Sequence, residues 1–429
     1  MQIGTSNHLT IGGVDVVELA TLSPYPLYIL DEKLIRMKMR AYLTSVKKYY
    51  PEHGEVFYAS KALINLALCK IAEQEGIGLD VASIGELFTA IQAKFPMKKV
   101  IMHGNNKSYE ELELAVKNNI GRIVIDNFDD IRMLSALTES LNQTVNVLIR
   151  IKPDVRVHTH TYIETGDKES KFGFDISVAQ EAIKSILKCN KLLFRGLHIH
   201  IGSQILEINA YKKAIDAVTL LIKNLYTSNI SIEECNLGGG LGIAYTDNDE
   251  KIDIENFIKD IATYLISAFQ YHELSLPTLL LEPGRSIIGE AGTTIYHIGS
   301  IKEMPGNRFY VAVNGGMNDN IRPSLYSAKY SAVLANRIQE EGICDCRIVG
   351  KLCESGDVLI DRILLPKPRR GDILAVLSTG AYNYSMASNY NRLPIPGMAL
   401  TYNGNVDWIV KPQALEDMIR NDLIPERLR

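Results

Sequence analysis

The sequence predicts a two-domain α/β protein: a (β/α)8 barrel of the TIM type, joined to a mostly antiparallel β-barrel or β-sandwich domain. Three observations lead to this prediction. The chain has 429 residues, which is too long for one ordinary domain and comfortable for two. From about residue 55, short β-branched runs alternate with segments of helical period. After residue 286, short strands and turns follow one another with few helices between them.

The barrel prediction depends on counting the β-branched runs. Segments of helical period separate them, such as Leu63–Gln74 and Ile84–Lys94. Alternating strands and helices imply parallel strands with crossover helices, and eight such units indicate a closed barrel. An open doubly wound sheet is the alternative, but no G-x-G-x-x-G follows the first strand, which disfavours a dinucleotide fold. The eight candidate strands are Val56–Ala59, Gly78–Val81, Val100–Met102, Ile123–Ile125, Val147–Ile151, Leu197–Ile201, Cys235–Leu237 and Thr278–Leu281.

The β domain is expected to combine both ends of the chain. Near the start, Leu9–Ile11 and Val14–Glu18 flank Gly12-Gly13, which is a hairpin signal. We expect this hairpin to join the C-terminal sheet, so that residues 1–30 and 287–429 form the β domain and residues 31–286 form the barrel. The C-terminal candidate strands are Thr293–Ile301, Arg308–Val313, Cys346–Gly350 and Asp372–Leu377.

Composition excludes several classes of function. The formal net charge of −4 and the lack of basic, aromatic-interleaved patches argue against nucleic acid or anionic lipid as a partner. No apolar run is long enough to cross a bilayer, and the first 20 residues do not resemble a secretory signal. Six scattered cysteines fit a reducing compartment, so we expect a cytoplasmic protein. The C-x-C-x6-C spacing near residue 350 lacks paired zinc knuckles, and no metal site is expected.

Polar side chains gather where the predicted barrel strands end. Catalytic groups of such barrels come from the C-terminal ends of several strands, so this clustering predicts a site at the barrel mouth. The residues at these ends are Ser60, Lys61, Asp80, His103, Asn105, Asp126, Arg150, His198, His200, Ser203, Gly238 to Gly240, Glu282 and Arg285.

A glycine-rich segment, residues 238–242 (GGGLG), follows the seventh strand. Glycines let backbone N–H groups approach an anion, and barrels of this type often bind phosphate after strands seven and eight. A lysine at the end of strand one and a carboxylate at the end of strand eight complete the set that pyridoxal 5′-phosphate (PLP) requires. Lys61 would form the resting imine, and Glu282 would keep the pyridine nitrogen protonated.

Motifs along nearly the whole chain resemble the alanine-racemase-fold group of PLP-dependent decarboxylases, and within it the diaminopimelate decarboxylases. They occur in family order: FYASKA (57–62), LDVAS (79–83), HTYIETGDKESKFG (160–173), GLHIHIGSQ (196–204), NLGGGLG (236–242), EPGRSIIGEAG (282–292), NDNIRPSLYSA (318–328), CESGD (353–357) and GAYNYSMASNYN (380–391). One departure is the segment Asn389–Arg392, where many relatives carry an additional residue before the arginine.

The resemblance implies roles for cofactor-binding residues. Lys61 corresponds to the imine lysine and Glu282 to the partner of the pyridine nitrogen. His200 corresponds to the imidazole that stacks on the cofactor ring, and Asp80 to the acid that orients this region. The remaining cofactor contacts that the resemblance implies are Ser203, Gly238, Gly239, Gly240, Arg285 and Tyr382.

The resemblance also implies how the substrate is recognised. Diaminopimelate carries a second carboxylate and a second ammonium at its distal end, and arginine suits a carboxylate because it offers paired donors. Glu354 corresponds to the partner of the distal ammonium, and Cys353 to a candidate donor of the proton to the α-carbon, alongside Lys61. The residues implied for the distal carboxylate are Arg285, Arg322 and Tyr326, and Tyr382, near the cofactor, is a further substrate contact.

The activity implied is decarboxylation of meso-2,6-diaminopimelate to L-lysine, the last step of lysine biosynthesis. In the family, the Cys353-Glu354 segment reaches the neighbouring subunit's site, so the resemblance implies a homodimer with shared active sites. Alternatives are an ornithine, lysine, arginine or carboxynorspermidine decarboxylase of the same fold, a racemase, or a regulatory relative without activity. The long polar segment Val155–Ser170 is expected to be mobile.

Overall fold

The structure, a computed structural model, describes residues 2–4, 6–153, 170–306 and 308–429. The segment predicted to be mobile, Val155–Ser170, therefore lies outside the described residues except for Ser170. The chain divides into two compact units, each described by itself below. Unit 1 comprises residues 1–35, 244–249 and 288–429, and unit 2 comprises residues 36–243 and 250–287. The predicted division at residues 30 and 286 lies close to these bounds, although the sequence alone does not separate the short segment 244–249.

Unit 2 is an eight-stranded parallel barrel. Each strand pairs in parallel with the next, and the pairing of β13 with β5 closes the ring. The predicted fold is thus confirmed. In order around the ring, the strands are β5 (Gly54–Ala59), β6 (Gly78–Val81), β7 (Val100–Met102), β8 (Arg122–Ile125), β9 (Val145–Lys152), β11 (Leu192–His198), β12 (Glu234–Asn236) and β13 (Thr278–Leu281), with β10 (Phe174–Asp175) added beside β9.

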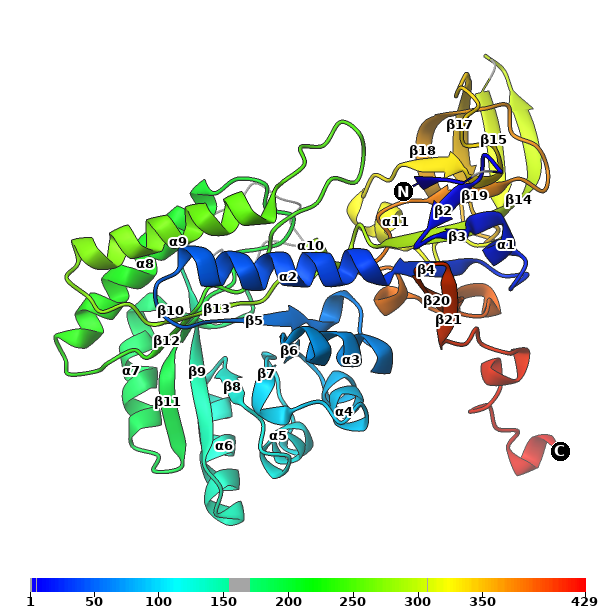
Figure 1. Cartoon of the computed structure of the whole chain (residues 1–429). Coiled ribbons are helices and arrows are strands. Elements are labelled where there is room, and N and C mark those ends of the chain that lie inside the picture. The colour runs from blue at the N-terminus through cyan, green and yellow to red at the C-terminus, as the bar shows by residue number, and fades with distance from the viewer. Residues whose placement is uncertain (1, 5, 154–169, 307) are drawn as a thin grey trace. The chain divides into compact units, whose positions relative to one another are not determined.

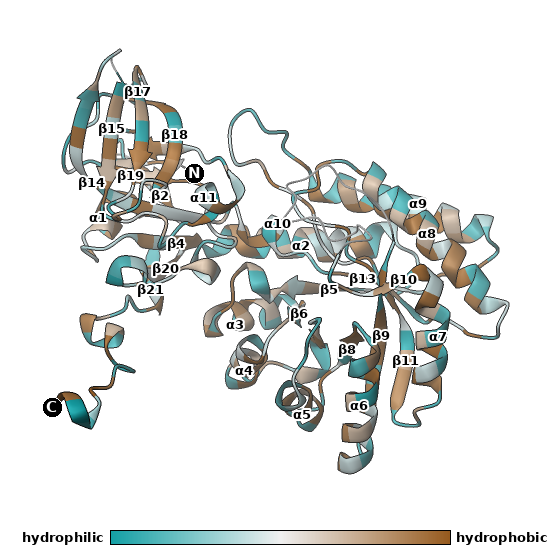
Figure 2. Cartoon of the chain, turned by 180° about the vertical axis from the view of Figure 1, so that it is seen from behind, coloured by the Kyte–Doolittle hydropathy of each residue, from teal (hydrophilic) through white to brown (hydrophobic). Residues whose placement is uncertain are grey.

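The helices of unit 2 lie around the outside of its strands (Figure 1). Hydrophobic residues dominate β8 and β9, whereas α8 and α9 carry both hydrophobic and hydrophilic positions (Figure 2). This contrast is expected, because parallel barrel strands are buried on both faces and the helices on one. The helices are α2 (Glu32–Tyr49), α3 (Leu66–Glu75), α4 (Ile84–Gln92), α5 (Tyr109–Lys117), α6 (Phe128–Leu141), α7 (Ile176–Leu187), α8 (Asn209–Tyr226), α9 (Ile254–Tyr271) and α10 (Arg285–Ile288).

A cluster of one arginine and two glutamates lies at the N-terminal end of the barrel. Arg122, at the start of β8, donates to Glu234 Oε2 over 2.7 Å and to Glu55 Oε1 over 3.1 Å. The three side chains come from β8, β12 and β5, so this ion cluster ties strands across the barrel. The opposite, C-terminal end of the barrel carries the loops with the polar residues predicted above.

Unit 1 is mostly antiparallel. β14 is its central strand, because it pairs antiparallel with β4, β15 and β19. Two pairs are parallel, β15 with β17 and β20 with β4. The strands of the large sheet are β4 (Leu27–Asp31), β14 (Gly292–Met304), β15 (Arg308–Val313), β16 (Ala332–Leu334), β17 (Cys344–Val349), β18 (Val358–Leu365), β19 (Ile373–Val376), β20 (Gly397–Tyr402) and β21 (Asn405–Val410).

The N-terminal hairpin corrects one prediction. β2 (Leu9–Ile11) and β3 (Val14–Asp15) form the predicted hairpin, with Gly12 and Gly13 at positive φ. With β1 (Gln2–Ile3) they form a separate three-stranded sheet, whereas we expected them to join the C-terminal sheet. They still share a hydrophobic core with strands of the large sheet.

The second half of the predicted strand Val14–Glu18 is helical. Asp15 ends β3, and its Oδ1 accepts a hydrogen bond from Val17 N over 2.8 Å, which caps α1 (Val16–Ala20). It is β4 that carries the N-terminal segment into the large sheet. Among the described residues, no helix is both long enough and apolar enough to pass through a membrane.

Candidate active site at the barrel mouth

Five of the predicted cofactor residues of unit 2 line one cavity of about 270 Å3. Lys61, in the turn after β5, lines it together with Asp80 of β6 and Glu282, which follows β13. His200 and Gly239 line it as well. Five strand ends predicted from the sequence therefore meet at one place, as the barrel topology requires.

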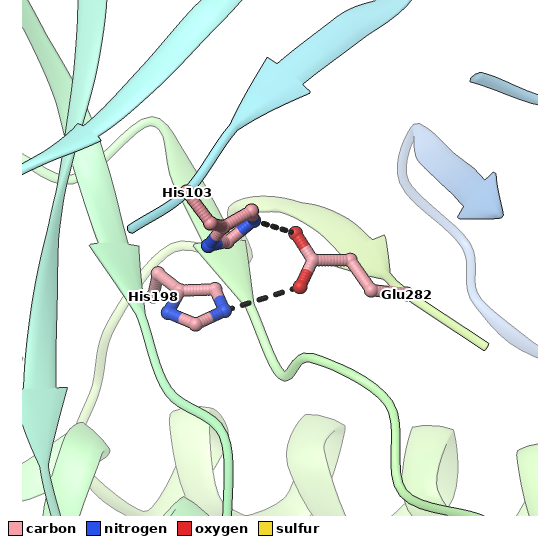
Figure 3. A group of neighbouring side chains, drawn as sticks. All are labelled: His103, His198 and Glu282. Carbon is pink, nitrogen blue, oxygen red and sulfur yellow. Dashed lines mark hydrogen bonds and ion pairs between the residues drawn. The ribbon is translucent and has the colours of Figure 1, made fainter. Parts of the chain in front are cut away.

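Glu282 is the most heavily bonded of these groups. Its carboxylate is buried, and Figure 3 shows it held between two imidazoles. Oε1 accepts from His103 Nε2 over 2.9 Å and from Asn236 Nδ2 over 2.6 Å, while Oε2 accepts from His198 Nε2 over 3.1 Å. With two donors on Oε1 and one on Oε2, the carboxylate keeps capacity for a further donor at Oε2.

The charges around Glu282 follow from burial and from its partners. Although burial alone would raise the pKa of Glu282, His103 and His198 hold it well below its usual range, so the group is a carboxylate. Burial opposes charge on His103, but Glu282 and Asp80 outweigh it and raise the pKa of His103. Burial lowers the pKa of His198 to about 3. One imidazolium and one neutral imidazole therefore flank the carboxylate.

His200 and Arg150 complete the electrostatics of the cavity. Burial and the nearby charge of Lys61 lower the pKa of His200 well below its usual range, so the imidazole is neutral. The Arg150 guanidinium lies over the Phe172 ring at 4.4 Å, and both side chains line the cavity. Burial raises the pKa of Asp80, opposed by His103. A neutral aromatic group and an ionised carboxylate in one cavity suit a flat, protonated heteroaromatic ligand.

The glycine run makes close backbone contacts beside the cavity. Gly238 N–H donates to Asn236 Oδ1 over 2.8 Å, and Gly239 N–H lies 3.4 Å from His200 Nδ1. A Cβ on Gly239 would stand 2.0 Å from the carbonyl oxygen of Glu282. These glycines thus allow backbone segments to approach closely, and the phosphate contact expected of them stays a prediction.

The structure brings Ser203 and Arg285 together, two residues that the resemblance implies for cofactor binding. Arg285 Nη2 donates to Ser203 Oγ over 2.9 Å, and Arg285 is buried. A guanidinium beside a hydroxyl is a donor set that phosphate prefers. The residues of unit 2 therefore fit PLP: an amine, a neutral imidazole, an ionised carboxylate and a phosphate-binding donor set.

The predicted substrate residues Arg322, Tyr326 and Tyr382 belong to unit 1. Arg322 begins α11 (Arg322–Tyr326) and is buried. Its Nη1 donates to the hydroxyls of Tyr330, at 2.5 Å, and Tyr245, at 3.1 Å. Tyr382 has φ of 66°, a left-handed conformation that a bulky side chain rarely adopts. Such strain is concentrated at functional sites.

Cys353 and Glu354 lie in the loop between β17 and β18 of the same unit. Both are exposed, and Cys353 is the exposed one of six free cysteines. In a single chain these two side chains are therefore accessible to solvent. The other five cysteine thiols are buried or half-buried.

Several site residues have no role in the sequence-based assignment. His103 and His198 were predicted at strand ends without a function, and Asn236 was not singled out. Their common signal is position, since each ends or directly follows a barrel strand. His103, His198 and Glu282 also place one potential ligand atom each within 4.8 Å of one another, and these are donor types that zinc uses. In this structure Glu282 is hydrogen-bonded to both histidines (Figure 3).

Comparison with known proteins places the chain in a family. The family model "Pyridoxal-dependent decarboxylase, pyridoxal binding domain" matches residues 33–289. The diaminopimelate decarboxylase of Bacillus subtilis (strain 168) is 45% identical over 422 residues, covering 97% of this chain and 95% of that protein. That of Bacillus methanolicus is 44% identical, covering 96% and 95%.

Solved structures agree with these matches. A crystal structure of diaminopimelate decarboxylase from M. jannaschii aligns with a TM-score of 0.92 at 34% identity, covering 100% of this chain and 98% of that one. The enzyme from Helicobacter pylori, complexed with L-lysine, aligns with a TM-score of 0.87 at 33% identity, covering 95% and 98%. The chain belongs to the diaminopimelate decarboxylase family of pyridoxal-dependent decarboxylases.

Proposed function

We propose that the chain uses PLP to decarboxylate meso-2,6-diaminopimelate to L-lysine and CO2, the last step of lysine biosynthesis. The observation that carries the proposal is one cavity lined by the Lys61 amine, neutral His200 and ionised Glu282. It occurs in a chain 45% identical to a diaminopimelate decarboxylase. Family members from M. jannaschii and H. pylori were solved with L-lysine, which is the product of this reaction.

Each cavity residue has a role in this proposal. Bound PLP supplies an electron-accepting ring that stabilises the charge left when CO2 departs. Lys61 would hold the cofactor through its amine, and Glu282 would keep a proton on the ring nitrogen. His200 would cover one face of the ring, with Asp80 orienting this region. The phosphate would be held by Ser203, Arg285, Tyr382 and the backbone of Gly238, Gly239 and Gly240.

Recognition of the distal end of the substrate is assigned to unit 1. A buried guanidinium with two tyrosine hydroxyls, as at Arg322, is a preorganised partner for a carboxylate. Tyr326, Tyr382 and Arg285 would contribute to the same carboxylate side, and Glu354 would pair with the distal ammonium. A substrate without the second carboxylate would leave the arginine without its partner, which favours diaminopimelate over ornithine or lysine.

The proton that replaces CO2 requires a donor at the α-carbon. Cys353 and the released Lys61 amine are the two candidates, because a thiol and an ammonium can each act as a general acid. The Cys353 thiol is exposed in the single chain, so this role needs a second surface that encloses it.

We propose that a homodimer provides that surface, with Cys353 and Glu354 of one subunit completing the site around Lys61 of the other. Two inactive variants, Lys61→Ala and Cys353→Ala, test this by mixing after dissociation. Random reassociation makes half of the dimers hybrid with one intact site each, so activity should return to about a quarter of wild type. No recovery from a mixture proven to exchange subunits contradicts shared sites.

The first test of the activity itself is spectroscopic. Wild-type protein with PLP should absorb in the visible as the lysine-bound cofactor, and meso-diaminopimelate should change that spectrum with release of CO2. Lys61→Ala should lose the lysine-bound absorbance, and its retention would contradict the assignment. CO2 release from ornithine, lysine, arginine or carboxynorspermidine in place of diaminopimelate would reassign the substrate, and chiral analysis of the product would reveal a racemase.

A protein that binds PLP and releases CO2 from none of these substrates would instead be a regulatory relative. We place the reaction in the cytoplasm, because all six cysteines are free thiols, as is usual in a reducing compartment.

A further inference from the structure

The loop that carries Cys353 and Glu354 is fixed on its inner side by Asp357. The buried Asp357 carboxylate accepts from Leu352 N over 2.9 Å and from Met317 N over 2.7 Å. Gly350 N donates to the Asp357 carbonyl over 3.0 Å. These bonds secure the two ends of the loop, and at its tip Glu354 accepts from Asp357 N over 3.1 Å and from Gly356 N over 3.3 Å.

The tip is contacted from outside by a segment far along the chain. Cys353 N donates to Asn391 Oδ1 over 2.8 Å, across 38 residues of sequence. The neighbouring Tyr390 hydroxyl lies 3.5 Å from Glu354 Oε2. Both residues proposed to complete the site are thus bonded to the same short segment, 389–392, at which this sequence departs from the family pattern.

The backbone of this segment is strained where it makes the contact. Asn391 has φ of 52° and Arg392 has φ of 56°, so two consecutive residues other than glycine are left-handed. Asparagine tolerates this conformation better than arginine does. Residues in such conformations persist only where the surroundings fix them, and they are concentrated at ligand sites.

The C-terminal segment supplies the bonds that fix the strained pair. Arg392 Nη2 pairs with Asp422 Oδ2 over 2.7 Å, and Arg392 Nη1 donates to the carbonyl of Met418. Asn389 Nδ2 donates to Gln413 Oε1 over 2.7 Å. Figure 1 shows this C-terminal segment, in red, running on beyond β21. Residues 413–422 therefore hold segment 389–392 in the conformation that presents Asn391 Oδ1.

We propose that Asn391 is a positioning residue: its side-chain oxygen fixes the Cys353 N–H and so orients the thiol and the Glu354 carboxylate. Arg392 and residues 413–422 keep Asn391 in place. The inference rests on the proposed function for the meaning of that orientation, but the hydrogen bond can be tested through the thiol alone.

Three variants of the holoenzyme separate the side chain from the backbone. Asn391→Gly removes Oδ1 while adopting the left-handed conformation without cost, so the fold is preserved. Asn391→Asp keeps an oxygen that accepts from Cys353 N–H. Asn405→Ala is the control, because it deletes an exposed amide of unit 1 that donates to the Tyr402 carbonyl over 3.4 Å and belongs neither to segment 389–392 nor to residues 413–422.

The first readout is the rate of alkylation of Cys353 by iodoacetamide as a function of pH, located by peptide mass. Asn391→Gly should change the limiting rate several-fold, whereas Asn405→Ala should not. Asn391→Asp should keep the wild-type limiting rate and move the midpoint to higher pH, because a nearby carboxylate disfavours the thiolate. A purely structural defect would not produce this pH shift together with an unchanged limiting rate.

The second readout is steady-state kinetics with meso-diaminopimelate. Asn391→Gly should lower kcat/KM by roughly 5- to 10-fold, the size of one lost hydrogen bond, and Asn391→Asp should restore it. Wild-type alkylation and kinetics in Asn391→Gly, or an Asn391→Asp variant as impaired as the glycine variant, would overturn the proposal. If wild type itself does not decarboxylate diaminopimelate, the proposed function fails, while the alkylation series still decides whether Asn391 positions Cys353.

Discussion

His103 Nε2 lies 2.9 Å from Glu282 Oε1, and the two side chains reach each other from loops 179 residues apart in sequence. Both are buried, and each favours the charged form of the other. Because both groups are buried, water does not compete for the hydrogen bond that joins the carboxylate to the imidazolium, and the two charges stabilise each other as an ion pair. Glu282 is therefore already a negatively charged carboxylate before a cofactor with a ring nitrogen binds.

Replacing Glu282 with glutamine should remove that charge while keeping the shape. We expect kcat to fall by about 10²- to 10³-fold, as when one preorganised electrostatic partner is lost from an active site. Steady-state assays with meso-diaminopimelate check this, with the PLP content of each variant measured by absorbance. Glu234→Gln at the opposite end of the barrel is the control and should stay within about two-fold of wild type, because its ion pair with Arg122 stabilises the barrel only. Equal losses in both variants would show a folding defect and not a catalytic one.

His198 should make stability depend on pH. Its folded-state pKa of about 3 lies below the value of about 6.5 for an unfolded histidine, so between these values the unfolded chain binds a proton that the folded chain does not. Folding stability therefore decreases as pH falls from about 6.5 to 3 through this group. His198→Gln, which can still donate to Glu282, should have a shallower pH dependence over this window. Denaturant unfolding at pH 4, 5, 6 and 7 measures the slopes, and identical slopes would refute the assignment.

Gly239→Ala should destabilise the barrel through a steric clash, because its Cβ would stand 2.0 Å from the Glu282 carbonyl oxygen. Overpacking of this kind costs about 1–3 kcal/mol or more. Gly85→Ala is the opposite case: Gly85 lies in α4, and its Cβ would meet only Ser83 Oγ, at 3.9 Å. Alanine there should stabilise the protein by up to about 1 kcal/mol, since it is the better helix former. Thermal and urea unfolding of both variants measure the difference, and a destabilised Gly85→Ala would remove the contrast.

Arg322→Lys should affect substrate binding more than chemistry. Lysine retains a positive charge but not the planar pair of donors that matches a carboxylate. We expect KM for diaminopimelate to rise by about 10- to 100-fold, with kcat changed far less, as for the loss of one to two charge-assisted hydrogen bonds. Tyr330→Phe removes only the hydroxyl that Arg322 contacts at 2.5 Å and should have a smaller effect in the same direction. An unchanged KM in Arg322→Lys would exclude Arg322 from the substrate site.

The barrel was predictable because its signal is local and repeated. β6, β7 and β13 have the bounds that the hydrophobic runs predict, and a polar residue at or just after the end of each run indicated the mouth. The prediction of a strand over Val14–Glu18 was wrong beyond Asp15 for a local reason: its valines are typical of a strand, but Asp15 caps a helix. A side-chain cap competes with strand pairing in a way that hydropathy does not register.

Contacts between distant segments were not predictable from single residues. Asn236 donates a hydrogen bond to Glu282 over 2.6 Å, and the residues next to Asn236 in the sequence do not indicate this partner. The glycine run shows the same limit. Its composition and place in the chain indicated an anion site, but not the close approach of the Glu282 backbone that requires a glycine at position 239. A residue type shows which backbone conformations a position can adopt. It does not show which distant segment packs against that position and requires one of them.

The pairing of β4 with β20 has a consequence for synthesis of the protein. The two strands run parallel, and Thr401 Oγ1 donates to the Leu30 carbonyl across 371 residues. β4 therefore leaves the ribosome long before its neighbour exists, while the barrel strands between them can already pair. Pairings with such large sequence separation form slowly. Until β20 is made, the edge of β4 that pairs with it can bind other strands. Unit 1 should be the last part to assemble after translation ends, and the part most dependent on protection from aggregation until then.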